Sequence, residues 1–205
     1  MLERFSMLVN AARLFLFVSL VFFHTTVTAA PTSIGEETLA ALQAKTIFLG
    51  GATGVNSSHV LKQLQDLGLD VRGMTRNVDR AIKKFGSQYT WNKADVTDPD
   101  LLTAAVEGVD IVISAVASMM PFGSNTSGKV DYEGTLNLAN AAKAAGATRF
   151  VIITSSSSGL KDRFLNAIGG NALIWKGKAE QVLVDSGMEY VVMEPAAIAD
   201  SPGAQ

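Results

Sequence analysis

The sequence contains no cysteine and only two histidines, His24 and His59, in 205 residues. Without cysteine the chain can form neither a disulfide framework nor a thiolate metal site, and a thiolate nucleophile is excluded as well. Two histidines without partner ligands do not make a convincing zinc site. We therefore expect no metal centre and no covalent catalysis through sulfur.

Charge of either sign is also scarce. Lysine and arginine number 17 and aspartate and glutamate 19, which gives a formal net charge of −2. Nucleic-acid-binding proteins concentrate their cations on one face, and the one basic stretch here, residues 72–84, is better explained by a smaller ligand described below. We expect no nucleic-acid partner. The length suits one α/β domain better than two.

Residues 1–29 follow the order of a secretory signal peptide. Arg4 and Arg13 precede an apolar run over residues 14–23, and small residues up to Ala29 come next. The run is shorter than the about 20 residues of a transmembrane helix, so we favour cleavage over an uncleaved membrane anchor. Residues 30–44 are interpreted as a linker.

Two destinations stay open for such a chain. N-glycosylation sequons begin at Asn56 and Asn125, and a glycan on Asn56 would block the loop described in the following paragraphs. Delivery to the ER lumen or secretion is the simpler route. Alternatively, residues 1–29 are the first part of a bipartite presequence that carries the protein onward to a plastid, which avoids that conflict.

From Lys45 onward, β-branched runs alternate with helical stretches. The predicted strands span residues 46–49, 70–75, a weaker run before Asp95, 110–115, 149–154 and 190–193. The predicted helices span residues 55–67, 78–85, 98–106, 130–145 and 171–186. Parallel neighbouring strands need helical crossovers. The pattern over residues 45–205 therefore predicts an α/β, doubly wound parallel sheet of the Rossmann type with six strands.

A glycine-rich loop separates the first predicted strand from the first helix. Glycine at position 51 permits a tight turn, and glycine at position 54 lets the backbone approach a pyrophosphate at the helix N-terminus. Ser57 occupies the third position, where a small residue allows close packing of helix and strand. The loop predicts a dinucleotide site formed by Gly51, Ala52, Thr53, Gly54, Val55 and Asn56.

The end of the second strand decides which dinucleotide is favoured. NAD-binding domains commonly carry an acidic residue there, which holds the ribose 2′-hydroxyl. This chain carries Arg76 instead, followed by Arg80, Lys83 and Lys84. A guanidinium matches the geometry of a 2′-phosphate, so the sequence favours NADP(H) over NAD(H) as the cofactor.

From these motifs the sequence resembles the atypical short-chain dehydrogenase/reductase group with NmrA-like and related plant NAD(P)-binding domains. The branch it resembles most occurs in chloroplast assembly factors and complex I-associated proteins. The segments that carry the resemblance are Gly51–Gly54, Arg76, residues 94–98, 112–115, 130–135, 149–151 with the serines at 155–158, and 175–180. The resemblance implies that Asp95 and Val96 flank the adenine. It also implies that Ala115 and Val116 lie beside the nicotinamide ribose.

The resemblance also implies a catalytic site. Active members use a serine after the fifth strand and a Tyr-x-x-x-Lys pair in which the tyrosine phenol transfers a proton. Ser155 or Ser156 matches the serine and Lys176 matches the lysine, but Ala172 stands where the tyrosine is expected. Tyr132 belongs to another predicted helix and is a poor substitute.

Two further departures bear on activity. Relatives carry Arg-Pro after the sixth strand, whereas this chain has Glu194 before Pro195. The sequence given stops at Gln205, so the C-terminal region that covers the substrate in relatives is expected to be missing. Three readings follow: an NADP(H)-dependent oxidoreductase with a degenerate site, a non-catalytic NADP(H)-sensing scaffold or assembly factor, or a cofactor-free structural domain. A protein partner or a homodimer fits the first two.

Overall fold

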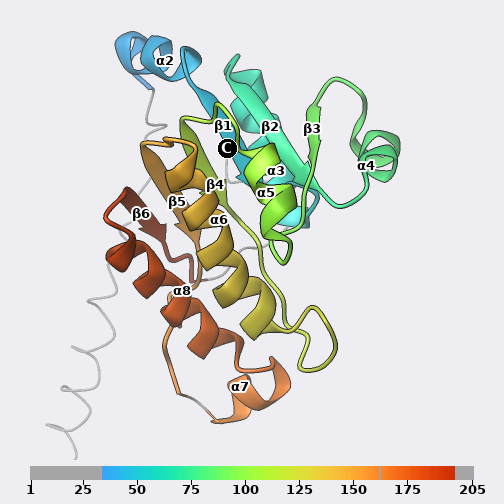
Figure 1. The fold of residues 1–205 in the computed structure, drawn as a ribbon, viewed down its shortest axis with the longest axis vertical. Coiled ribbons are helices and arrows are strands. Elements are labelled where there is room, and N and C mark those ends of the chain that lie inside the picture. The colour runs from blue at the N-terminus through green and yellow to red at the C-terminus, as the bar shows by residue number, and fades with distance from the viewer. Residues whose placement is uncertain (1–33, 162, 197–205) are drawn as a thin grey trace, which may run out of the picture. The chain divides into compact units, whose positions relative to one another are not determined.

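The computed structural model describes residues 34–161 and 163–196 (Figure 1). The elements described here belong to one unit that begins at Glu36. The signal-peptide segment predicted at residues 1–29 lies outside the described residues. Among the described residues, no helix combines the length and apolar character needed to cross a bilayer.

One six-stranded sheet organises this unit. Its strands are β1 (Thr46–Gly50), β2 (Asp70–Thr75), β3 (Thr90–Lys93), β4 (Ile111–Ser114), β5 (Arg149–Ile153) and β6 (Glu189–Met193). Their order in the sheet is β3-β2-β1-β4-β5-β6, and every neighbouring pair is parallel. The predicted doubly wound parallel sheet is thus confirmed. The chain reverses its direction of travel across the sheet between β1 and β4, the point where ligands of such sheets bind.

Helices connect the strands on both faces (Figure 1). They are α2 (Glu36–Gln43), α3 (Val55–Asp66), α4 (Val78–Phe85), α5 (Pro99–Ala105), α6 (Gly134–Ala144), α7 (Arg163–Ile168) and α8 (Ala172–Ser186). Asp98 caps α5 as its sequence predicts, because its Oδ1 accepts the Leu101 N–H at 3.1 Å and Pro99 occupies the first turn.

The larger core lies under α5, α6 and α8, which pack side by side on one face of the sheet (Figure 1). Phe48 and Phe150 point to this face from β1 and β5, and neither has any exposed surface. Leu138 of α6 and Leu183 of α8 are equally buried against them. Burial of such side chains stabilises the fold by about 1.5–3 kcal/mol each.

The smaller core covers the opposite face, under α3. Ile47 and Leu49 of β1 contact Leu61 of α3 there. Leu39 and Leu42 of α2 pack against the same cluster. Residues 30–44, predicted to be a linker, thus contain the helix α2 in their second half. Leu39 and Leu42 lie three residues apart and so share one apolar face of that helix.

Two details depart from the predicted elements. The helix predicted at residues 130–145 is a π-helix, η1 (Gly128–Glu133), that runs directly into α6. Helix α7 was not predicted at all. The short sequence of α7 has weak apolar periodicity, so it does not stand out as a helix. The apolar residues of η1 have a spacing that an α-helix also allows, so the sequence does not distinguish the π-helix from an α-helix.

Candidate functional site

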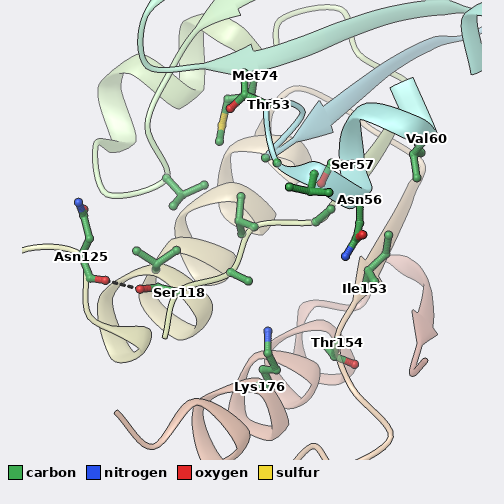
Figure 2. A pocket seen from close by; sticks show the side chains of 18 of the residues that line it. Thr53, Asn56, Ser57, Val60, Met74, Ser118, Asn125, Ile153, Thr154 and Lys176 are labelled. Carbon is green, nitrogen blue, oxygen red and sulfur yellow. Dashed lines mark hydrogen bonds between the residues drawn. The ribbon is translucent and has the colours of Figure 1, made fainter. Parts of the chain in front are cut away.

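A cleft of about 1130 Å³ runs along the C-terminal ends of the strands. Residues that follow β1, β2, β4, β5 and β6 all line it, and Figure 2 shows the labelled side chains converging on it. Its lining includes the predicted residues Gly51, Thr53, Gly54, Val55, Asn56, Arg76, Asp95, Val96, Ala115, Val116 and Lys176. Segments that lie far apart in the sequence therefore meet at one site.

The loop after β1 forms a narrow cradle. Gly51 has φ +75°, and a Cβ atom there would lie 2.7 Å from the Ala115 carbonyl oxygen. Gly54 precedes α3 in an extended conformation, with no side chain capping the helix. The first backbone N–H groups of α3 thus face the cleft, as a pyrophosphate site requires. A dinucleotide fits this cradle.

Two other loop residues support the cradle from below. Ser57, the residue in place of the third glycine, is 5% exposed, which shows that a serine is accommodated between helix and sheet. Ala52 is fully buried, and a Cβ atom on Gly73 of β2 would lie 3.2 Å from the Ala52 Cβ. Ala52 therefore packs beneath the loop, whereas its neighbours line the cleft.

Cations gather beside the end of β2. Arg76 is exposed and lines both the main cleft and an adjoining pocket of about 240 Å³. Arg80 and Lys84 of α4 line that same pocket. Asn77 fixes the start of α4, because its Oδ1 accepts the Arg80 N–H at 2.9 Å. Three positive side chains thus surround a small pocket that opens next to the cradle.

Asp95 and Val96 lie after β3 on the other side of Arg76. Val96 is 4% exposed, whereas the Asp95 carboxylate accepts hydrogen bonds from the Thr97 N–H at 2.9 Å and the Thr97 hydroxyl at 2.8 Å. These local bonds hold the turn in a fixed conformation. Asp95, Thr97 and Arg76 border a second adjoining pocket of about 460 Å³.

A buried ion pair lies at the opposite end of the cleft. Lys176 Nζ of α8 donates to Asp131 Oδ1 of η1 at 2.7 Å, and the two side chains are 14% and 2% exposed. The Ser118 N–H donates to the second oxygen of Asp131 at 3.0 Å. Burial raises the pKa of Asp131 above its ordinary value, and the Lys176 charge opposes that shift. Figure 2 shows the Lys176 amino group pointing into the cleft.

The π-geometry of η1 brings this pair together. Thr135 donates its hydroxyl hydrogen to the Asp131 carbonyl at 2.6 Å, which stabilises the wide turn. A Cβ atom on Gly128 would lie 3.2 Å from the Trp175 ring, so η1 and α8 approach closely. Sequence reasoning cited Asp131 only as part of a resemblance and did not identify it as a site residue. A buried carboxylate that reaches a lysine 45 residues away leaves no local pattern.

The hydroxyl groups after β5 lie in two different settings. Thr154 lines the cleft, and its buried Oγ1 pairs with no described residue. Ser155 Oγ accepts the Ser157 N–H at 3.2 Å within its own turn, and Ser156 donates its backbone N–H to the Pro195 carbonyl at 3.2 Å. The Ser155 hydroxyl is therefore engaged within its own turn and Ser156 is held through its backbone, and the described lining of the cleft includes neither. Thr154 does line the cleft, but its hydroxyl oxygen is buried.

Ala172 and Tyr132 leave this end without a phenol. Ala172 is 6% exposed at the start of α8. Tyr132 stacks on Trp175, with ring centroids 5.8 Å apart, and Lys178 Nζ lies 4.4 Å from the Trp175 centroid. The described lining of the cleft does not include Tyr132. In the described residues, no group of three or more histidine, cysteine, aspartate or glutamate side chains is arranged to hold a metal ion.

Comparison with known proteins places this geometry among dinucleotide-binding domains. A family model described as NAD(P)H-binding matches residues 51–205. The chain is 30% identical over 195 residues to sanguinarine reductase of Eschscholzia californica, which covers 77% of this chain and 71% of that protein. It is 28% identical to the chloroplastic protein TIC 62 of Arabidopsis thaliana, which covers 82% of this chain and 28% of that protein.

Solved structures agree on the fold. A putative NAD-dependent epimerase/dehydratase from Bacillus halodurans superposes with a TM-score of 0.67 at 20% identity, which covers 77% of this chain and 73% of that one. At this level of identity the likeness shows the architecture of the sheet and its helices, and nothing about a substrate.

Proposed function

This chain belongs to the NAD(P)H-binding family of atypical short-chain dehydrogenases/reductases, and we propose that it binds NADP(H) and acts as an oxidoreductase. The pyrophosphate lies against Gly51, Gly54 and the first turn of α3. The adenine lies beside Asp95 and Val96, and the nicotinamide ribose lies beside Ala115 and Val116.

The observation that carries the choice of NADP(H) is the group of cations at the end of β2. Arg76, Arg80 and Lys84 line one pocket next to the cradle. A ribose 2′-hydroxyl needs an acceptor, whereas a 2′-phosphate needs cations, and Arg binds phosphate through two parallel N–H donors. The position that carries an acidic residue in NAD-binding domains carries Arg76 here. These charges support NADP(H) over NAD(H).

The other end of the cleft supports redox chemistry. A bound NADPH supplies a hydride at this end. Lys176 places its ammonium group there, held by Asp131. Thr154 lines the cleft, and Ser155 and Ser156 in the next turn stay candidate catalytic hydroxyls. We therefore assign Lys176 as the group that faces the acceptor.

A non-catalytic NADP(H)-sensing scaffold or assembly factor is the second candidate. Ala172 in place of the expected tyrosine favours it, because an alanine transfers no proton. In this case the cofactor stabilises the fold or signals the redox state to a partner protein. A homodimer is compatible with either candidate function.

We also propose a plastid destination for this chain. TIC 62, with which it shares 28% identity, is a chloroplastic protein. The two sequon residues Asn56 and Asn125 both line the cleft. A glycan on either one would obstruct the site, which supports onward delivery over a final location in the ER lumen.

Calorimetric titration of the full chain with NADPH and with NADH tests the cofactor proposal. We expect NADPH to bind at least tenfold more tightly, which corresponds to about 1.4 kcal/mol. Arg76→Ala should remove most of that preference. Lys83→Ala is the matched control, because Lys83 is an exposed cation of the same helix region that does not border the pocket. Equal affinities for NADPH and NADH would contradict the choice of cofactor.

The decrease of NADPH absorbance with time distinguishes the two candidate functions. The oxidoreductase consumes NADPH when a suitable acceptor is added, whereas the scaffold binds NADPH without consuming it. If neither nucleotide binds, both functions fail and the third reading, a structural domain without a cofactor, replaces them.

A further inference from the structure

The acceptor end of the cleft contains a cation but no described phenol. Lys176 lies there with a 14% exposed side chain, and Ala172 lies one helical turn earlier. The hydroxyl of Ser118 already donates to the Asn125 carbonyl at 2.5 Å (Figure 2). A reaction at this site therefore has electrostatic stabilisation available, but it lacks the acid that the family's active members use.

This combination restricts the acceptor on chemical grounds. A simple ketone that gains a hydride becomes an alkoxide, which is about as basic as hydroxide. Such an anion must be protonated as it forms. A quinone that gains a hydride becomes a hydroquinone monoanion, a phenolate whose conjugate acid has a pKa of about 10. The second anion is stable enough to form beside a cation without an acid.

The lining at this end suits a flat apolar ring. The lining includes the apolar residues Val116, Ala117, Met120, Val130, Met193 and Pro195, together with Glu194. Met120 is 57% exposed, and the same loop carries Met119 at 68% and Phe122 at 84% exposure. Methionine adapts its shape to aromatic faces and makes favourable sulfur–ring contacts. Exposed apolar side chains at a cleft mouth are unusual enough to indicate a binding role.

The cation is held in a position to stabilise an anion. Asp131 accepts one of the three N–H donors of Lys176, at 2.7 Å. Asp131 is in turn fixed by the Ser118 N–H at 3.0 Å and lies in a buried turn of η1. Among the described residues, Asp131 is the hydrogen-bond partner of this ammonium group, which leaves its two other donors to face the cleft.

We propose that the acceptor is an uncharged, planar quinone, reduced by two electrons without a proton from the protein. The hydride pair forms a new O–H bond at one quinone oxygen, and the π pair of that C=O bond shifts into the ring. The π pair of the opposite C=O bond then moves onto its own oxygen. That oxygen becomes a phenolate beside Lys176 and then takes a proton from water in the open cleft. The proposal rests on the proposed oxidoreductase function, and Lys176 acts in it through its charge alone.

Binding of 2-naphthol to the full chain without cofactor tests the role of Lys176 independently of turnover. Naphthol matches a two-ring hydroquinone, and its ionised form has a distinct absorbance. We expect a lysine in this position to lower the pKa of bound naphthol by at least one unit from about 10. An unchanged pKa on the wild-type protein would overturn the proposal.

The variants are chosen so that a folding defect cannot mimic the expected loss. Lys176→Met alone leaves the Asp131 carboxylate buried without its cation, so it is combined with Asp131→Asn, which keeps an acceptor for the Ser118 N–H and preserves the net charge. The double variant should abolish the pKa shift. Lys129→Met, which removes an exposed lysine of η1 paired with Glu133, should leave it intact. Retention of the shift in the double variant would also overturn the proposal.

Turnover with a matched pair of acceptors completes the test. 1,4-Naphthoquinone and 1-tetralone share a two-ring skeleton, but only the first yields a phenolate. With NADPH, and after subtraction of the rate without protein, we expect kcat/KM for the quinone to exceed that for the ketone at least a hundredfold. If kcat/KM for the two acceptors differs by less than tenfold, the quinone proposal is refuted but the proposed oxidoreductase function is not. Absence of NADPH binding would instead refute the proposed function and leave the naphthol result standing.

Discussion

Removing Lys176 should destabilise the protein far more than removing Lys176 and Asp131 together. In the Lys176→Met variant, the Asp131 side chain, which is 2% exposed, loses its cation and keeps the backbone N–H groups of Ser118, at 3.0 Å, and of Asp131 itself. Breaking a buried ion pair on one side costs about 3–5 kcal/mol. Lys176 is 14% exposed and reaches water more easily, so Asp131→Asn should cost less, about 1 kcal/mol.

The double variant Lys176→Met/Asp131→Asn buries no charge and should cost about 1 kcal/mol. If Lys176→Met lowers the free energy of unfolding by about 3 kcal/mol, the double-mutant cycle gives a coupling energy of about 3 kcal/mol between the two side chains. This value is at the upper end for residues in contact. The free energy of unfolding of each variant, measured by urea denaturation at pH 7.5, provides the four values. A coupling energy below about 0.5 kcal/mol would refute the reasoning, because the pair would then contribute nothing beyond its separate side chains.

The dependence on pH supplies an independent check of the same pair. Burial raises the folded-state pKa of Asp131 above its ordinary value of 3.8, against the opposing Lys176 charge. The stabilising contribution of a protonated Asp131 is complete below that ordinary value and is lost as pH rises through the raised folded-state pKa. Lys176→Met removes the opposing charge and raises the pKa further. The deficit of this variant should therefore shrink when unfolding is measured at lower pH, and a deficit that grows in acid would contradict the assignment.

Two further substitutions test the loop and a helix cap. Gly51→Ala should lower NADPH affinity at least tenfold by calorimetry, because φ is +75° and the new Cβ would lie 2.7 Å from the Ala115 carbonyl oxygen; affinity equal to the wild type would show that the loop does not hold the pyrophosphate. Asp98→Ala should lower the free energy of unfolding by about 1 kcal/mol, since it removes the bond to the Leu101 N–H. Asp100→Ala in the same turn serves as the control, and an equal loss there would mean that helix charge rather than capping is responsible.

Much of the fold could be predicted from local patterns. The helix predicted at residues 78–85 matches α4 at both ends, because Asn77 caps its start and Gly86 follows its last residue. The strands from residue 46 onward were found through their β-branched runs, and their parallel pairing follows from the helices between them. The segment predicted to be a linker, residues 30–44, contains α2, whose Leu39 and Leu42 contact the distant core.

Part of the candidate site could likewise be predicted from local patterns, and part could not. Three site residues could be recognised from their immediate neighbours in the sequence. Gly51 allows a required turn, Gly54 allows a close backbone approach, and Arg76 places a charge directly after a strand. Which of the residues after β5 lines the cleft depends on how one turn is hydrogen-bonded. Spacing alone does not distinguish adjacent hydroxyl groups.

The sequence by itself determined the sheet, the dinucleotide loop, the cation after β2 and the missing tyrosine, because each depends on residues within a few positions of one another. Only the tertiary structure decided that Asp131 and Lys176 form a buried pair and that Arg80 and Lys84 share a pocket with Arg76. Those arrangements depend on how η1 packs on α8 and how α4 returns toward the end of β2. Such packing is set by many weak contacts distributed over the chain, which no single segment of the sequence specifies.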